Sequence, residues 1–287
     1  MNYVYLNGEY LPREQATVSV MDRGFLFGDG IYEVIPCYNH KLFRFHQHIV
    51  RLKQSLAATR IQQKFSPEDW LEIINKLIEM NRLKHCSVYL QVTRGLIEER
   101  DHCFTRDNSA SVFVMTRPLP ASHEQPDESG LSLLAVDDIR WHRCDIKSTS
   151  LIANCLLKQQ AQDQGADEVL LVRDGKAIEG GASNLFIVAD GVIKTPPKNE
   201  LILAGITRDL IVELAHNNNM PLVEDYFSLE DVYAADEVWI SSSTRQLSPV
   251  WQVDSQLIND GKTGAVWYQI IEHYNEFKQK LYRGEVD

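Results

Sequence analysis

Lys147 is the residue whose type and position most favour chemistry. It lies in RWHRCDIKSTS, directly between a strand pattern and a helix pattern, where a scaffold can hold a reactive group rigidly. Further along, AIEGGASNLFIV places Glu179 before Gly180 and Gly181, small residues that let a flat ring approach the backbone. Most lysines are solvated surface residues, and a strand with a bulge also explains the second segment. Neither segment alone predicts a site.

Two other segments have features that suit a phosphate group. In AGITRDLIVELA, Gly205 ends a loop and Thr207 is a favourable N-cap, so backbone N–H groups at the positive end of a helix face outward. In ISSSTRQLSP, a run of hydroxyl groups follows the strand pattern EVWI and supplies further hydrogen-bond donors. Most threonine N-caps bind no ligand, and Ser-Thr clusters are more often plain loops, so these segments gain weight only together.

The elements that must position these residues form two groups. Turn signals and apolar periodicity predict an N-terminal domain at 1–118. Its hairpin VYLNGEYL turns at Asn7-Gly8, and a second strand pair turns at Asn39-His40. Its helices are HQHIVRLKQSLAAT and, after the N-cap Ser66 with a following proline, DWLEIINKLIEMNRL. The strands CSVYLQVTRG and SASVFVMTRPL complete it.

A larger C-terminal domain is predicted at 131–287, after a linker at 119–130 that is rich in Pro, Ser and acidic residues. Its strand patterns include LSLLAVDDIRW and EVLLV, separated by a helix, LIANCLLKQQAQDQG. Two Asp-Gly turns bound a meander around KAIEGGASNLFIV, and helices near 206–218 and 264–281 follow. The pattern indicates an α+β protein of two domains, with a cleft between them as the expected site.

Composition limits the function classes. The net charge is −11, from 29 Lys and Arg against 40 Asp and Glu, which disfavours nucleic acid and anionic membranes as partners. The five cysteines show no CxxC pair, and no apolar run reaches the ~20 residues of a membrane span. We therefore expect a cytoplasmic protein with free thiols. His46 and His48 are spaced i,i+2 and cannot share a helix face, so no metal site is predicted.

Taken together, these segments resemble the fold-type IV family of pyridoxal 5'-phosphate (PLP) enzymes, and within it the D-amino-acid transaminases, over the whole chain. The matching segments are MDRGFLFGDGIYEV at 21–34, HIVRL at 48–52, VTRG at 92–95, DIRWHRCDIKS at 138–148, EGGASNLF at 179–186, GITRD at 205–209 and the SSST turn. The resemblance implies a two-domain fold with PLP at the domain interface.

The resemblance also assigns roles. Lys147 would hold the cofactor covalently and move the α-proton of the substrate, and Glu179 would lie against the pyridine nitrogen. Arg51 would bind the phosphate in a forked geometry. The structural alternative for Arg51 is a salt bridge on an exposed helix face. The other phosphate ligands implied are Ile206, Thr207, Ser242 and Ser243.

Substrate selection would depend on the loop after VTRG. In the D-amino-acid transaminases an Arg-x-His pair and a tyrosine bind the substrate carboxylate, which here implies Arg100, His102 and Tyr32, with Thr244 also at the substrate. The loop is expected to come from the neighbouring subunit of a homodimer. Glu98 and Glu99 directly precede Arg100 and could neutralise it. Arg245 is either a surface residue or a ligand for an acidic side chain.

The resulting hypothesis is ping-pong transfer of an amino group from D-alanine or a similar D-amino acid to 2-oxoglutarate or another 2-oxo acid. A branched-chain L-amino-acid transaminase is the second alternative, and a lyase that cleaves aminodeoxychorismate is the third. A non-catalytic PLP-binding protein with the same fold is the remaining possibility. The presence of both Lys147 and Glu179 argues against it.

Overall fold

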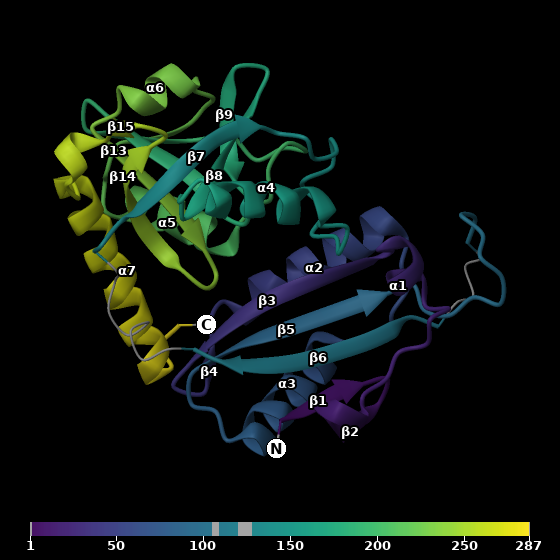
Figure 1. Ribbon diagram of the computed structural model, residues 1–287. Coiled ribbons are helices and arrows are strands. Elements are labelled where there is room, and N and C mark those ends of the chain that lie inside the picture. Colours follow the sequence, from purple (N-terminus) through teal and green to yellow (C-terminus); the bar gives the residue numbers. More distant parts are fainter. Residues whose placement is uncertain (1, 105–108, 120–127, 287) are drawn as a thin grey trace. The chain divides into compact units, whose positions relative to one another are not determined.

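The computed structural model describes residues 2–104, 109–119 and 128–286 (Figure 1). Contacts group the chain into two compact units. Unit 1 comprises Met1–Ala121, Ile146–Ser150 and Leu281–Asp287, and unit 2 comprises Ser122–Asp145 and Leu151–Lys280. Lys147 is thus grouped with the N-terminal part of the chain. Residues 120–127 of the predicted linker lie outside the described residues.

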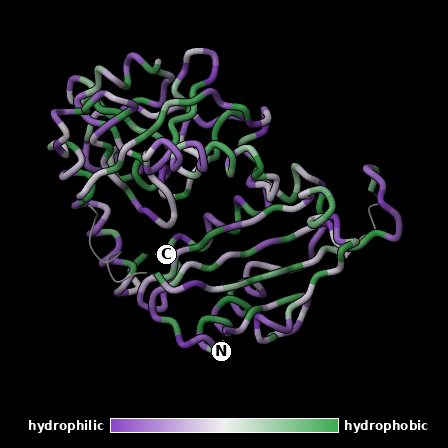
Figure 2. The backbone as a smooth tube through the Cα atoms, viewed as in Figure 1, coloured by the Kyte–Doolittle hydropathy of each residue, from purple (hydrophilic) through white to green (hydrophobic). Residues whose placement is uncertain are grey.

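Unit 1 contains a six-stranded sheet in which all described neighbours run antiparallel, in the order β2-β1-β6-β5-β3-β4. The predicted Asn7-Gly8 turn joins its first two strands and has positive φ at both residues, 49° and 102°. Strand β5 alternates apolar and polar residues, so one face is apolar (Figure 2). The strands are β1 (Tyr3–Leu6), β2 (Glu9–Pro12), β3 (Gly30–Tyr38), β4 (Lys41–Leu42), β5 (Cys86–Thr93) and β6 (Ser111–Pro118).

The two long helices of unit 1 pack with this sheet around one core. Both were predicted from their apolar periodicity, and Ser66 caps the second through a complete capping box with Asp69. A short helix that the pattern did not predict precedes β3. The helical segments are η1 (Arg13–Gln15), α1 (Arg23–Phe27), α2 (Phe45–Thr59) and α3 (Pro67–Asn81).

Unit 2 contains a nine-stranded mixed sheet whose order is β12-β11-β10-β13-β14-β7-β8-β9, with β15 paired to β14. An additional pairing of Asn184 in β10 with Glu179 in β9 closes part of this sheet into a ring of strands. The strands are β7 (Leu131–Asp137), β8 (Glu168–Arg173), β9 (Lys176–Gly180), β10 (Asn184–Ala189), β11 (Val192–Thr195), β12 (Leu222–Glu224), β13 (Glu237–Ser242), β14 (Gln246–Val253) and β15 (Gln256–Leu257).

The helices of unit 2 include those predicted near 206–218 and 264–281, with one corrected boundary. Gly205 occupies the N-cap and the helix starts at Ile206, so the predicted N-cap role of Thr207 is wrong. Gly205 takes that position because its backbone is extended there (φ −70°, ψ 133°). The helical segments are α4 (Ile152–Asp163), α5 (Ile206–Asn217), α6 (Leu229–Tyr233), η3 (Asn259–Gly261) and α7 (Ala265–Arg283).

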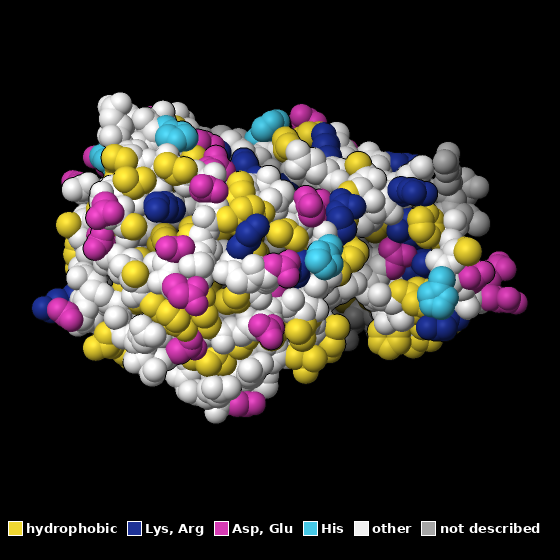
Figure 3. Space-filling model, turned by 90° about the horizontal axis from the view of Figure 1, so that it is seen from above, with side chains coloured by type: hydrophobic (Ala, Val, Ile, Leu, Met, Phe, Trp, Pro, Cys, Tyr) yellow, Lys and Arg dark blue, Asp and Glu magenta, His cyan; other side chains and the backbone are white. Residues whose placement is uncertain are grey.

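The surface shows no sign of a specialised polyelectrolyte partner. On the face in Figure 3, the visible described residues show acidic and basic side chains interspersed rather than gathered by sign. Among the described residues no helix combines the length and the apolar character needed to cross a membrane.

Candidate active site

Lys147 is fixed by its backbone against the start of β3 in unit 1. Its carbonyl accepts a hydrogen bond from the Tyr32 N–H at 3.0 Å, and its own N–H donates to Ser55 Oγ at 3.3 Å. The next residue, Ser148, forms a β-bridge with Ile31. The half-buried amine lies 4.3 Å from the centre of the Tyr32 ring. The segment therefore presents one amine from a rigid support.

Tyr32 belongs to an aromatic pair beside this amine. Its ring stacks on Tyr89 with centroids 5.6 Å apart and planes at 27°. The Tyr89 hydroxyl donates to Gln91 Oε1 at 2.6 Å, and burial raises the pKa of Tyr89 to about 12. Tyr89 is therefore a neutral hydroxyl at physiological pH, and its packing orients the Tyr32 ring.

Arg51 is buried on α2 and is not the exposed surface arginine of the structural alternative. It forks onto Glu33 of β3, with Nε 2.8 Å from Oε1 and Nη2 2.7 Å from Oε2. His48 Nδ1 lies 2.8 Å from the same Oε2. Burial alone would raise the pKa of Glu33, but Arg51 and His48 outweigh it and hold that pKa well below its usual range.

The environment of His48 is apolar enough to keep the ring neutral. Burial lowers the pKa of His48 despite the neighbouring Glu33 carboxylate. The neutral ring can donate its Nδ1–H to Glu33, and within the described chain its buried Nε2 has no hydrogen-bond partner. Because a guanidinium carries more N–H groups than Glu33 uses, the geometry of Arg51 is compatible with an additional anion.

Glu179 lies buried in unit 2, where β9 meets Asn184 of β10. Arg140 Nη1 donates to its Oε1 at 2.6 Å, Asn184 Nδ2 to its Oε2 at 3.0 Å, and the Leu203 N–H lies 3.2 Å from Oε2. Burial raises the pKa of Glu179, and the charge of Arg140 acts in the opposite direction. A carboxylate has capacity for a further donor, so Glu179 suits a protonated ring nitrogen.

The start of α5 has the features of an anion site. The first N–H groups of a helix have no partner within it, and Ile206 and Thr207, both buried, supply two of them here. No side chain caps this helix. A Cβ at Gly205 would lie 1.9 Å from Asn184 Oδ1, so only glycine permits this close approach to β10.

Two buried hydroxyls of unit 2 support a missing polar ligand. In the described part of the chain, Ser183 Oγ and Ser241 Oγ are buried without a hydrogen-bond partner, which is a costly state for a polar atom. Ser241 pairs in register with Asn184. The combination of a helix start, a carboxylate and unsatisfied hydroxyls fits the polar edge of PLP.

The predicted hydroxyl turn connects β13 and β14. Ser242 Oγ accepts the Arg245 N–H at 3.1 Å, so this hydroxyl stabilises the turn. Ser243 is half-buried, whereas Thr244 and Arg245 are exposed. The side chain of Arg245 therefore has the position of a surface residue.

Arg100 and His102 lie together in the loop after β5, and both are exposed. The Arg100 guanidinium lies 4.8 Å from the Phe27 ring centre, and the His102 ring lies 5.3 Å from it. Within the described residues, neither Glu98 nor Glu99 forms an ion pair with Arg100. The neighbouring acids thus leave this charge available.

The structure brings the predicted residues into two sets. Unit 1 carries Lys147, Tyr32, Arg51, Arg100 and His102, and unit 2 carries Glu179, Ile206, Thr207, Ser242, Ser243 and Thr244. Sequence reasoning missed Glu33 and Arg140, which bind Arg51 and Glu179. The signal for Glu33 was a single charge in the apolar strand pattern GIYEVIPCY, because a buried charge requires a partner.

Comparison with known proteins gives a consistent result. The family model for amino-transferase class IV matches residues 30–253. The chain is 39% identical over 275 residues to D-alanine aminotransferase of Listeria monocytogenes strain 10403S, covering 95% of each. It is 38% identical to D-alanine aminotransferase of Staphylococcus aureus strain N315, covering 96% of this chain and 98% of the relative.

Solved structures agree on the fold. Branched-chain amino acid aminotransferase from Escherichia coli matches with a TM-score of 0.88 and 27% identity, covering 100% of this chain and 96% of that one. A second branched-chain amino acid aminotransferase, from the organism abbreviated T.th. and solved with pyridoxamine 5'-phosphate, matches with a TM-score of 0.87 and 26% identity, covering 99% and 95%. The predicted fold class is confirmed by these matches.

Proposed function

The chain belongs to the amino-transferase class IV family, and on that premise we propose that it transfers amino groups from D-amino acids such as D-alanine to 2-oxo acids such as 2-oxoglutarate. It is a PLP-dependent enzyme, as the family is. The observation that supports the D-amino-acid substrate is the identity of 39% over 95% of the chain to D-alanine aminotransferases. The solved branched-chain enzymes are less similar, at 26–27% identity.

We assign the cofactor residues from the geometry. Lys147 supplies the amine that binds the cofactor and carries the α-proton, because its backbone is fixed on both sides. Glu179 holds the proton of the ring nitrogen. Arg51, the α5 start at Ile206 and Thr207, and the hydroxyls of Ser242 and Ser243 bind the phosphate. When bound, PLP supplies the electron sink that stabilises negative charge at the substrate α-carbon.

We assign the substrate carboxylate to Arg100, His102 and Tyr32, with Thr244 near the substrate. Two cationic or neutral donors on one loop and a phenol can bind a carboxylate by several hydrogen bonds at once. A carboxylate held on one side of the α-carbon fixes which enantiomer places its α-hydrogen toward Lys147. The handedness of the substrate is therefore set by where this loop lies.

An absorbance spectrum of the purified protein tests the proposal, before and after separate additions of D-alanine and L-leucine. We expect the band of lysine-bound cofactor to disappear with D-alanine and to persist with L-leucine. Loss with L-leucine alone would establish the branched-chain alternative. The Lys147→Ala variant should lack both the band and turnover, and normal turnover in that variant would refute the assignment of Lys147.

A homodimer and a cytoplasmic location are part of the same proposal. The dimer follows from the expectation that the Arg100 loop serves a neighbouring subunit. The free state of Cys37, Cys86, Cys103, Cys144 and Cys155 supports a reducing compartment. Analytical ultracentrifugation and cell fractionation test the two statements separately.

A further inference from the structure

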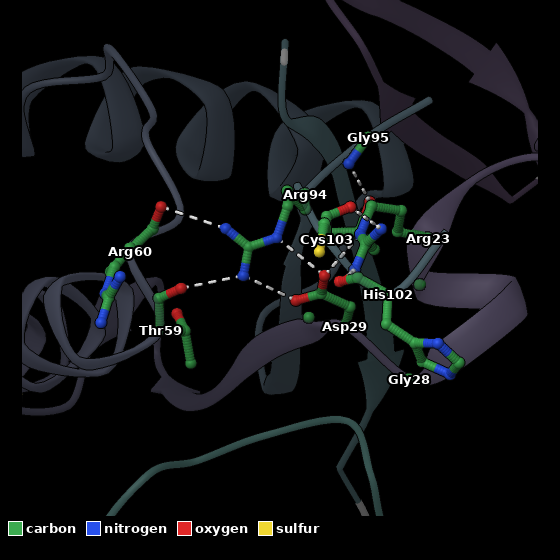
Figure 4. Close-up of polar contacts among 12 residues, drawn as sticks. Arg23, Gly28, Asp29, Thr59, Arg60, Arg94, Gly95, His102 and Cys103 are labelled. Atoms are coloured by element: carbon green, nitrogen blue, oxygen red, sulfur yellow. Dashed lines mark hydrogen bonds and ion pairs between the residues drawn. The ribbon is translucent and has the colours of Figure 1, made fainter. Parts of the chain in front are cut away.

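Arg23 of α1 holds the backbone of the loop that carries Arg100 and His102. It is buried, with 4% of its side chain exposed. Its Nη1 donates to the carbonyl oxygens of Asp101 at 2.6 Å and Cys103 at 3.2 Å, and its Nη2 donates to that of His102 at 3.0 Å. One planar guanidinium thus binds successive carbonyls of the loop (Figure 4).

Arg23 is itself held by a charge cluster. Its Nε donates to Asp29 Oδ2 at 2.7 Å, and Arg94 forks onto both oxygens of Asp29 at 2.7 and 2.9 Å (Figure 4). Arg94 also donates to the carbonyls of Thr59 and Arg60 at the end of α2, at 2.8 and 3.1 Å. The cluster therefore ties the loop to a rigid helix of unit 1.

Phe27, on the same short helix, supports the two functional side chains. Its ring centre lies 4.8 Å from the Arg100 guanidinium and 5.3 Å from the His102 ring, whose plane is tilted by 38°. Contacts between a cation and an aromatic face favour a fixed orientation. Arg23 thus fixes the backbone, and Phe27 fixes the direction of the side chains.

The rest of the segment MDRGFLFGDG builds α1 so that Arg23 and Phe27 have these positions. Asp22 caps the helix through the Gly24 N–H at 2.7 Å. A Cβ at Gly24 would lie 2.3 Å from Thr93 Cγ2, and Gly28 ends the helix with φ 64°. The helix can lie close to β5 only because these two positions are glycines.

We propose that Arg23 is a positioning residue for substrate binding, which acts by holding the Arg100–His102 loop in the geometry that binds the substrate carboxylate. Phe27 assists it. The inference rests on the proposed function, since it assigns the carboxylate to that loop. Displacement of a binding group by about 1 Å can reduce a rate about 100-fold, so the loss of an anchor of several hydrogen bonds is measurable in substrate binding.

The variants are Arg23→Gln, Arg23→Lys and Phe27→Leu in the full-length holoenzyme. Arg23→Gln leaves Asp29 and Arg94 as a balanced pair, so the buried charges still compensate. We expect Arg23→Gln to raise KM for D-alanine about 10- to 100-fold, with kcat changed about threefold at most. Arg23→Lys should raise KM less, because an ammonium keeps the charge but cannot span the same carbonyls. Phe27→Leu should raise KM by a few-fold.

Two measurements separate positioning from a general loss of stability. Hydrogen–deuterium exchange of amides at 98–104 in the cofactor-bound enzyme without substrate should be faster in Arg23→Gln and unchanged in Arg283→Gln, a control that loses only an exposed ion pair with Glu285. In the double variant Arg23→Gln, Arg100→Ala, the KM effects should not add, because Arg23 acts through Arg100.

The outcomes are distinct. Unchanged loop exchange, an unchanged KM, or additive effects in the double variant would each overturn the positioning role. A wild-type enzyme that fails to convert D-alanine contradicts the proposed function. A wild-type enzyme that converts it, with variant KM unaltered, contradicts only the role of Arg23.

Discussion

The pKa of Glu179 is determined by two opposing neighbours. Burial favours its protonated form, and Arg140, at 2.6 Å, favours the carboxylate. Arg140 is in turn held by Asp138, which receives its Nε and Nη2 at 2.9 Å. The charge that the ring nitrogen would contact is therefore maintained by a second pair of buried charges.

We predict that Arg140→Gln shifts the acid limb of the pH dependence of kcat/KM to higher pH by about one unit. Without Arg140 the pKa of Glu179, already raised by burial, rises further. As the pH falls, the carboxylate is then lost earlier and activity declines earlier. Steady-state rates with D-alanine between about pH 5 and 9 measure the shift.

The matched control for this prediction is Arg143→Gln, in the same segment. Arg143 is half-exposed and pairs with Asp145 at 2.9 Å, away from Glu179. Its pH profile should coincide with that of the wild type. An Arg140→Gln profile that also coincides would show that Arg140 does not tune Glu179.

At the scale of the element, the start of α5 depends on one close contact. Gly205 allows the helix to begin beside Asn184, whose amide nitrogen binds Glu179. Asn184 also donates to the carbonyl of Leu203 at 2.8 Å. The same asparagine thus couples the phosphate-binding helix start to the carboxylate proposed for the ring nitrogen.

We predict that Gly205→Ala weakens PLP binding about tenfold or more, because the added Cβ at 1.9 Å from Asn184 Oδ1 must displace either the helix start or Asn184. Fluorescence titration of the cofactor-free protein with PLP measures the affinity. Ser66→Ala at the N-cap of α3 is the control. It should lower the free energy of unfolding by about 1 kcal/mol and leave PLP affinity unchanged. Equal PLP affinity in Gly205→Ala would contradict the assignment of this helix.

At the scale of the whole molecule, the proposal requires a loop from one subunit in the site of another. Lys147 is fixed on β3, whereas Arg100 and His102 lie on an exposed loop of the same unit. A dimer in which the loop crosses makes the two residues complementary between subunits. A loop that serves its own subunit does not.

We predict that mixing the Lys147→Ala and Arg100→Ala proteins, unfolded and refolded together, restores about a quarter of wild-type activity, since half of the dimers are hybrids with one complete site each. Each variant refolded alone is the control and should have little activity. D-alanine turnover by the mixture measures the effect. The absence of any gain on mixing would show that the loop serves its own subunit.

The sequence by itself determined the local elements and the main chemical groups. Asn7-Gly8 predicted a hairpin, Ser66 predicted a helix start, and the segments around Lys147 and Glu179 indicated the family, all of which depend on neighbouring residues along the chain. These features are local, because turn geometry and helix caps involve only a few successive residues.

Only the tertiary structure decided which charges meet. The pairing of Arg51 with Glu33, of Arg140 with Glu179, and of Arg23 with the loop at 101–103 joins residues that are 18, 39 and about 80 positions apart. The cap of α5 also depended on it, because the approach of Asn184 leaves room only for Gly205. Such contacts arise from strand register and helix packing, which bring distant parts of the chain together, and no local pattern in the sequence encodes them.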